Sequence, residues 1–261
     1  MCECAYWPKS FLDEVEKTTV DRGIILWALG GPSFAYRTQE TLVWLDPYFS
    51  GTPDEVAALG TYRTTAIPVN PSQVSVADII ISTHSHPDHC DEHTLVPMLR
   101  HTRAFCVAPR SSAELMHAFG IPDNRIRVVR AGDSLRYRDI EVDVYPSQDI
   151  DDPHAVTFVF SSGGTQLFVG GDTLDSPTMM RIGETHRLDL ALLAFGRTWY
   201  MSEEELISAA GRLSPRTLLP FHWEFWRGHT GDITRLFQVY HRERPSFDIR
   251  IMLVGDSLRV V

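Results

Sequence analysis

The sequence ADIIISTHSHPDH, residues 77–89, joins an apolar run to three histidines and an aspartate. The first half, ADIIIS, is short and apolar, which predicts a buried β-strand leading directly into the polar half. The segment from His84 to His89 has no helical periodicity, so these side chains are expected in a loop at the strand exit. Functional sites are common at strand ends, so this loop is a candidate functional site.

The donor atoms of this loop suit divalent metal ions. Borderline metals favour imidazole nitrogen and carboxylate oxygen, and alternate residues of a turn can face two adjacent centres. The side chains of His84, His86, Asp88 and His89 therefore predict a site for two ions. The alternative is a polar loop with ordinary hydrogen bonds, which suits an isolated histidine better than three within six positions.

A two-metal site needs further ligands, and three later positions offer them. Asp172 ends the run LFVGGD and His222 ends TLLPFH, so each is expected at a sheet edge close to the first loop. Asp172 is a candidate to bridge two ions, and His222 is a candidate to complete the second. His154, in DDPHAVTFVF, is a candidate third imidazole on the first ion, although a histidine after an AspAspPro turn can also act only as a cap.

Asp46, at the end of TLVWLDP, is a candidate to orient a ligand histidine by accepting the proton of its other ring nitrogen. Before Pro47 the same residue could instead start a turn, and the spacing favours neither role.

Other side chains near strand ends are candidates for binding a substrate. Three arginines could hold a substrate phosphate, although such residues are more often solvated: Arg63, Arg197 and Arg227. Four aromatic residues could form a wall for a ring substrate, although such residues usually just pack: Trp199, Tyr200, Trp223 and Trp226.

The remaining pattern predicts an α/β fold with two strand-rich halves. The first half reads as a helix, a β-meander, a long irregular segment and two helices around a strand: 11–17, 23–47, 48–76, 92–101, 104–109 and 111–120. The second half reads as two hairpins, then alternating strands and helices, then a hairpin: 125–145, 154–172, 188–196, 202–213, 217–222, 233–243 and 249–261. With helices on the outside, these elements predict a four-layer αββα sandwich in one domain over residues 1–261.

Net charge and composition limit the classes of partner and the compartment that we expect for this chain. A formal net charge of -10 disfavours a nucleic-acid backbone, and no basic run offers a local patch for one. The opening residues lack the layout of a secretory signal, and no apolar stretch is long enough to span a bilayer. The four cysteines form neither a paired CxxC zinc pattern nor a disulfide framework. We therefore expect a cytoplasmic protein that acts on a small molecule, with a homo-oligomer plausible by frequency alone.

The motif HSHPDH (84–89), the later GGDT (170–173) and PFH (220–222) together resemble the metallo-β-lactamase superfamily. Within it the chain is most similar to the L-ascorbate-6-phosphate lactonase group, through LWALGGPSFAYR (26–37), VWLDPYFSGT (43–52), YRTT (62–65) and FHWEFW (221–226). The resemblance implies a first ion held by His84, His86 and His154, a second held by Asp88, His89 and His222, and Asp172 between them.

The same resemblance implies a metal-dependent hydrolase. Two divalent ions, manganese or zinc, lower the pKa of a bridging water so that hydroxide can attack the carbonyl of a sugar-type lactone at neutral pH. Asp88 is expected to orient that water or move its proton. The substrate is a small molecule, with a phosphorylated one as an option that the arginines would serve.

Two alternative functions remain open. A phosphodiesterase is the alternative within the enzymes, and a non-catalytic metal-binding module is the alternative outside them. The complete set of histidines and carboxylates favours catalysis, since a fold alone does not need a buried charge cluster. A diiron redox protein of this fold would carry glutamate in place of His86, which disfavours that class.

Overall fold

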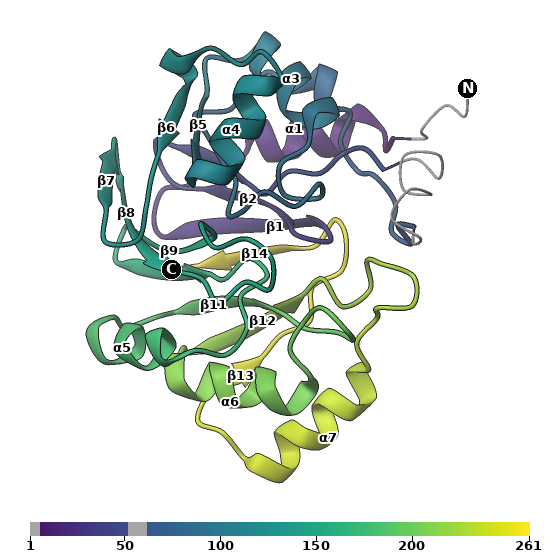
Figure 1. Cartoon of the computed structure of the whole chain (residues 1–261), viewed down its shortest axis with the longest axis vertical. Coiled ribbons are helices and arrows are strands. Elements are labelled where there is room, and N and C mark those ends of the chain that lie inside the picture. The colour runs from purple at the N-terminus through teal and green to yellow at the C-terminus, as the bar shows by residue number, and fades with distance from the viewer. Residues whose placement is uncertain (1–5, 52–61) are drawn as a thin grey trace.

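The computed structural model describes residues 6–51 and 62–261, and these residues form two facing seven-stranded sheets (Figure 1). Helices cover the outer face of each sheet, so the expected four-layer αββα sandwich is confirmed. Part of the irregular segment predicted for 48–76, namely 52–61, lies outside the described residues. No helix in the described part of the chain is long and apolar enough to cross a membrane.

The first sheet combines an antiparallel meander with parallel strands. Its order is β14-β1-β2-β3-β4-β5-β6, and β3 to β6 run parallel. The strands are β1 (Ile24–Gly30), β2 (Ser33–Arg37), β3 (Leu42–Leu45), β4 (Ile79–Ile81), β5 (Phe105–Ala108), β6 (Ile126–Val128) and β14 (Ser257–Val260). The described residues that accompany this sheet form the helices α1 (Lys9–Lys17), α3 (Glu92–His101) and α4 (Arg110–Ala118) and the 3-10 turns η2 (Pro71–Gln73) and η3 (Asp123–Arg125).

The second sheet has the order β13-β12-β11-β10-β9-β8-β7, with β10 to β13 parallel. Its strands are β7 (Ser134–Tyr137), β8 (Ile140–Pro146), β9 (Val156–Ser162), β10 (Thr165–Val169), β11 (Leu190–Ala194), β12 (Thr217–Phe221) and β13 (Asp248–Ile249). The helices α5 (Pro177–Thr185), α6 (Glu203–Leu213) and α7 (Ile233–Glu243) cover its outer face (Figure 1). A capping box of Ser202 and Glu205 begins α6.

The run of three isoleucines in β4 is explained by burial on both faces of the first sheet. Successive side chains of a strand point to opposite faces. Ile79 and Ile81 pack into the central core between the two sheets, whereas Ile80 packs into the outer core beneath the helices. The strand therefore needs no polar face, and its carboxyl end is held rigidly where the histidine loop begins.

Of the hairpins predicted from the sequence, one is confirmed only in part and one is wrong. In the predicted hairpin 125–145, only β7 and β8 pair with each other, while β6 adds to the first sheet beside β5. In the predicted hairpin 249–261, β13 belongs to the second sheet and β14 pairs with β1 of the first. Alternating apolar residues indicate a strand but carry no information about which neighbour it pairs with.

The helix α5 was not predicted. The segment Pro177–Thr185 contains a glycine and two threonines, which weaken a helical pattern. Gly183 is required there by packing, because a Cβ at this position would lie 2.2 Å from the carbonyl oxygen of Arg212 on α6. Tertiary contact with α6 thus decides the conformation of this segment.

We predict that Phe158→Ala lowers the free energy of unfolding by about 3–5 kcal/mol, the usual cost of emptying a buried aromatic site. Phe158 is fully buried in the core between the sheets. Denaturant unfolding measures the change. Met180→Ala, on the exposed side of α5 with 52% of the residue accessible, is the control and should alter stability by less than about 0.5 kcal/mol. Equal losses in both variants would contradict this placement of the core.

Candidate metal centre

The candidate metal centre lies where several strands end. Asp46 follows β3, the histidine loop follows β4, Asp172 follows β10, and His222 follows β12. Because β3 and β4 run parallel, and β10 to β12 also run parallel, these carboxyl ends meet at one edge of the sandwich. Both sheets therefore contribute side chains to one cluster.

The histidine loop is held by its own backbone. The N–H groups of His89 and Cys90 both donate to the carbonyl of His86 at 2.9 Å, and the Ser82 hydroxyl donates to the carbonyl of His84 at 2.9 Å. This short turn directs successive polar side chains to the same side.

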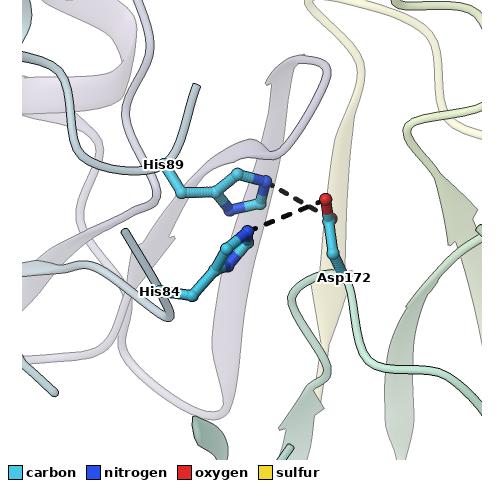
Figure 2. Close-up of side chains that lie close together, drawn as sticks. All are labelled: His84, His89 and Asp172. Atoms are coloured by element: carbon cyan, nitrogen blue, oxygen red, sulfur yellow. Dashed lines mark ion pairs between the residues drawn. The ribbon is translucent and has the colours of Figure 1, made fainter. Parts of the chain in front are cut away.

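The structure brings together the ligand cluster, which consists of His84, His86, Asp88, His89, Asp149, Asp172 and His222. It contains three groups whose ligand atoms lie within 4.8 Å of one another. The first group is His84, His86 and Asp149. The second is Asp88, His89 and His222. The third group joins His84 of the first group and His89 of the second to Asp172 (Figure 2).

Asp172 lies between the first two groups. Its carboxylate oxygens are 3.8 Å from His84 Nε2 and 3.3 Å from His89 Nε2 (Figure 2). They also approach His222 Nε2 to 3.8 Å. Ligands about 2.0–2.2 Å from a tetrahedral ion stand roughly 3.4 Å from one another. The cluster has this spacing, and Asp172 is within reach of both ligand groups.

His89 Nε2 and Asp172 Oδ1 face each other at the centre of the cluster, 3.3 Å apart, and both are buried. Beyond this ion pair neither atom has a hydrogen-bond partner. Buried polar atoms that are not fully hydrogen-bonded are costly. A divalent ion would bind both atoms at once, so the residues present fit a metal ion.

Asp46 fixes the ring of His89. Its Oδ2 is 2.9 Å from His89 Nδ1, which leaves Nε2 pointing into the cluster. The same carboxylate accepts the backbone N–H of Thr83 at 2.7 Å and its hydroxyl at 2.8 Å. Asp46 thus makes the contact that the sequence suggested for an orienting residue, from a backbone with a positive φ of 40°.

The backbone is strained or restricted at two other points of the site. His222 has a φ of 69°, a conformation that is uncommon for residues other than glycine and is often found at functional positions. Gly171 precedes Asp172 with a φ of 56°, and a Cβ there would lie 2.7 Å from the Thr83 hydroxyl oxygen. Only glycine allows the loop after β10 to approach the histidine loop this closely.

Burial and neighbouring charges have opposite effects on the cluster. Burial, with the charge of His89, brings the pKa of His84 well below its usual value. Burial also opposes charge on His89, but the carboxylates of Asp172, Asp46 and Asp88 outweigh it and raise the pKa of His89. The imidazoles likewise outweigh burial at Asp88 and Asp172 and lower the pKa of both carboxyls. The ionised carboxylates are therefore stabilised by positive charge, which divalent ions supply in place of protons.

His154 lies outside the ligand cluster. It is exposed, and its backbone N–H donates to Asp152 Oδ1 at 2.8 Å, so it takes part in a turn. Asp149, and not His154, lies beside His84 and His86. The Asp149 side chain is only 2% exposed, and its Oδ2 is 3.9 Å from His84 Nε2. The sequence signal for Asp149 was weak, because an aspartate among the three of SQDIDDP (147–153) is typical of a turn.

Asp152 ties the loop that carries Asp149 to the histidine loop. Its Oδ2 accepts the backbone N–H of Ser85 at 2.9 Å, the Ser85 hydroxyl at 2.8 Å and the Ser111 hydroxyl at 2.6 Å. Its own backbone N–H donates to Asp149 Oδ1 at 2.8 Å. These bonds fix the position of Asp149 relative to His84.

The three candidate arginines lie outside the wall of the cavity described below. Arg63 directs its guanidinium at the backbone carbonyls of Tyr48, Ser50, Thr65 and Ala66, so it fastens a loop. Arg197 is exposed, and Arg227 lies over the ring of Tyr62 at 4.9 Å.

A cavity of about 240 Å³ opens onto the cluster. Ten residues line it: His86, Pro87, Asp88, Asp149, Ile150, Asp151, Asp172, Trp199, Tyr200 and Trp226. Of the four aromatic candidates, Trp223 is not part of this wall. The sequence pointed to the other three only through their nearness to strand ends, and it gave no indication of Ile150 and Asp151.

Known proteins share this arrangement of strands. The chain is 24% identical over 196 residues to the probable L-ascorbate-6-phosphate lactonase of Salmonella heidelberg, covering 65% of this chain and 55% of that protein. It thus matches about half the length of that relative. A metallo hydrolase of Ignicoccus hospitalis superposes with a TM-score of 0.72 at 18% identity, over 91% of this chain and 98% of that one. An isothiocyanate hydrolase from Delia radicum gut bacteria superposes with a TM-score of 0.72 at 16% identity, over 90% and 98%.

The family model described as the beta-lactamase superfamily domain matches residues 25–222, which is most of the chain. The match starts in β1 and ends at His222, so it spans the whole ligand cluster. The chain therefore belongs to the metallo-β-lactamase superfamily of metal-dependent hydrolases.

Proposed function

We propose that this hydrolase opens lactones or closely related esters at a centre of two divalent metal ions. The observation that carries the proposal is Asp172, whose carboxylate lies within 3.8 Å of histidine nitrogens from both ligand groups. A carboxylate so placed can be shared by two ions. The similarity to the probable lactonase of Salmonella heidelberg supports the lactone as substrate.

The ligand cluster divides between the two ions. His84, His86 and Asp149 would hold the first, Asp88, His89 and His222 the second, and Asp172 would be common to both. When bound, such ions supply a water that ionises near neutral pH and an acid that polarises a carbonyl. No nucleophile from the protein is needed.

Two side chains in the cavity wall would assist the reaction. Asp88 Oδ2 accepts the indole N–H of Trp226 at 3.0 Å, which fixes the carboxylate where it can orient the attacking water or accept its proton. The Tyr200 hydroxyl lies 3.4 Å from His222 Nε2, and burial together with the charges of Asp172 and Asp88 raises its pKa well above 10. Tyr200 therefore stays protonated and can donate to the oxyanion that develops on the substrate.

We propose manganese as the preferred ion over zinc. Asp149 would supply oxygen to the first ion where the sequence suggested a third imidazole, so that, with Asp172, this ion would have as many carboxylate as imidazole ligands. Oxygen ligands favour harder ions such as manganese, and imidazole favours zinc.

The phosphodiesterase alternative has less support. Phosphodiester substrates are usually held by cations, and no lysine or arginine lines the cavity in the described part of the chain.

The first test is hydrolysis of a panel of sugar and alkyl lactones by manganese-loaded protein. His86→Ala should reduce turnover to below about 1% of the wild type, because it removes a ligand of the first ion. Because His86 is half-buried, its replacement should leave thermal unfolding of the metal-free protein almost unchanged. His101→Ala, on the exposed end of α3, is the control and should keep full activity. Normal turnover by His86→Ala would refute the two-metal mechanism.

Asp149→His should shift metal preference from manganese toward zinc by about tenfold, since it exchanges an oxygen ligand for nitrogen. The measurement is the metal content of protein equilibrated with both ions, read by mass spectrometry without any assay of activity. Asp21→His, at an exposed position, is the matched control. An unchanged metal ratio in Asp149→His would exclude Asp149 as a ligand.

Asp46→Asn should weaken binding of one metal equivalent by about 10–100-fold, because a neutral amide no longer fixes the ring of His89. Titration calorimetry resolves the two equivalents. Binding of both equivalents as in the wild type would show that the contact between Asp46 and His89 does not tune the metal.

A further inference from the structure

We infer that the substrate carries no anionic group in the part that fills the cavity, and that Asp151 enforces this selection. The inference rests on the proposed function, in which the cavity in front of the ligand cluster receives the substrate. It narrows the substrate class to compact, uncharged lactones or esters and excludes sugar phosphates.

Within the described residues, the ionisable side chains that line the cavity apart from Tyr200 are His86 and four aspartates. Asp88, Asp149 and Asp172 belong to the ligand cluster, and Asp151 is the fourth carboxylate. Asp151 is exposed, and its backbone N–H donates to Asp149 Oδ1 at 2.9 Å. Within residues 6–51 and 62–261 its carboxylate has no hydrogen bond or ion pair, so it is free to act on whatever enters.

No basic side chain is available to offset this charge. The guanidinium of Arg63 is occupied by four carbonyl groups, and neither Arg197 nor Arg227 lines the cavity. Residues 1–5 and 52–61 contain no lysine or arginine, so every such side chain of the protein belongs to the part that the structure describes.

The charge balance remains negative when the metal site is filled. Two divalent ions bring four positive charges, which the carboxylates of Asp88, Asp149 and Asp172 and one hydroxide neutralise. The charge of Asp151 then stays uncompensated at the entrance. For two unit charges about 6 Å apart at an effective dielectric constant of about 40, the repulsion lowers binding roughly tenfold.

The rest of the wall is apolar, aromatic and fixed. Trp226 is held by its bond to Asp88, and the ring of Tyr200 lies 4.6 Å from that of His222. Trp199 stacks on His229 with ring centroids 3.6 Å apart and an angle of 9° between the planes. Flat aromatic faces favour a ring or a short apolar chain. At about 240 Å³ the cavity is below the range of ~300–1,000 Å³ typical of drug-sized ligands, which indicates a compact substrate.

The test compares a sugar 1,4-lactone with its 6-phosphate as substrates of the manganese-loaded protein. The wild type should prefer the uncharged lactone by at least about tenfold in kcat/KM. Asp151→Asn should raise kcat/KM for the phosphate about tenfold and change that for the uncharged lactone less than twofold. Asp21→Asn, the matched exposed control, should leave both values unchanged. Equal use of the two substrates by the wild type, or equal changes for both in Asp151→Asn, would overturn the inference.

A binding measurement separates this inference from the proposed function. If neither lactone is hydrolysed, the proposed function fails, and quenching of tryptophan fluorescence by benzyl alcohol and by benzenesulfonate still reports on the cavity. The wild type should bind the alcohol more tightly, and Asp151→Asn should tighten only the sulfonate. Equal affinity for both probes, unchanged in Asp151→Asn, would overturn the selection against anions while leaving hydrolysis of another substrate open to test.

Discussion

The structure depends on the burial of several carboxylates at one edge of the sandwich. The side chains of Asp88 and Asp172 are each 9% exposed, and that of Asp149 is 2% exposed. Ionised groups so deeply buried are very costly unless positive charge and hydrogen bonds compensate them. Metal binding supplies that charge, so stability of the fold and occupancy of the site are coupled. The packing of both sheets can be understood as a rigid frame that keeps these like charges together.

That frame connects the two halves of the chain at the site itself. Thr83 contacts Asp46 of the first half through its hydroxyl, lies against Gly171 of the second, and accepts the N–H of Val156 through its carbonyl at 3.0 Å. The ligands therefore do not sit on separate flexible loops. A shift of one sheet against the other would displace Asp172 and His222 relative to the histidine loop.

Most of the secondary structure and the histidine loop could be predicted from the sequence, because both depend on residues that are close together in the chain. Apolar periodicity indicated most strands and helices, and three imidazoles within six residues predicted the metal loop. The pairing of β6, β13 and β14 could not be predicted, because a pattern of apolar residues identifies a strand but not the strand beside it in the sheet. Whether Asp149 or His154 joins the first ligand group depends on the path of one loop, which Asp152 holds. The sequence favoured His154, because a histidine is a more typical metal ligand than an aspartate in a turn. Arg63 was one of three candidates for binding a substrate phosphate, because its four carbonyl partners cannot be seen in the sequence.

The loop after β8 has a double role. Over three consecutive residues it carries a ligand-cluster carboxylate, an exposed apolar side chain and the free carboxylate of the entrance, namely Asp149, Ile150 and Asp151. Asp152 anchors all three through its bonds to Ser85 and Ser111. If Asp149 holds a metal ion and Asp151 selects the substrate, as we propose, an exchange of this one loop would alter metal preference and substrate charge together, with both sheets left intact.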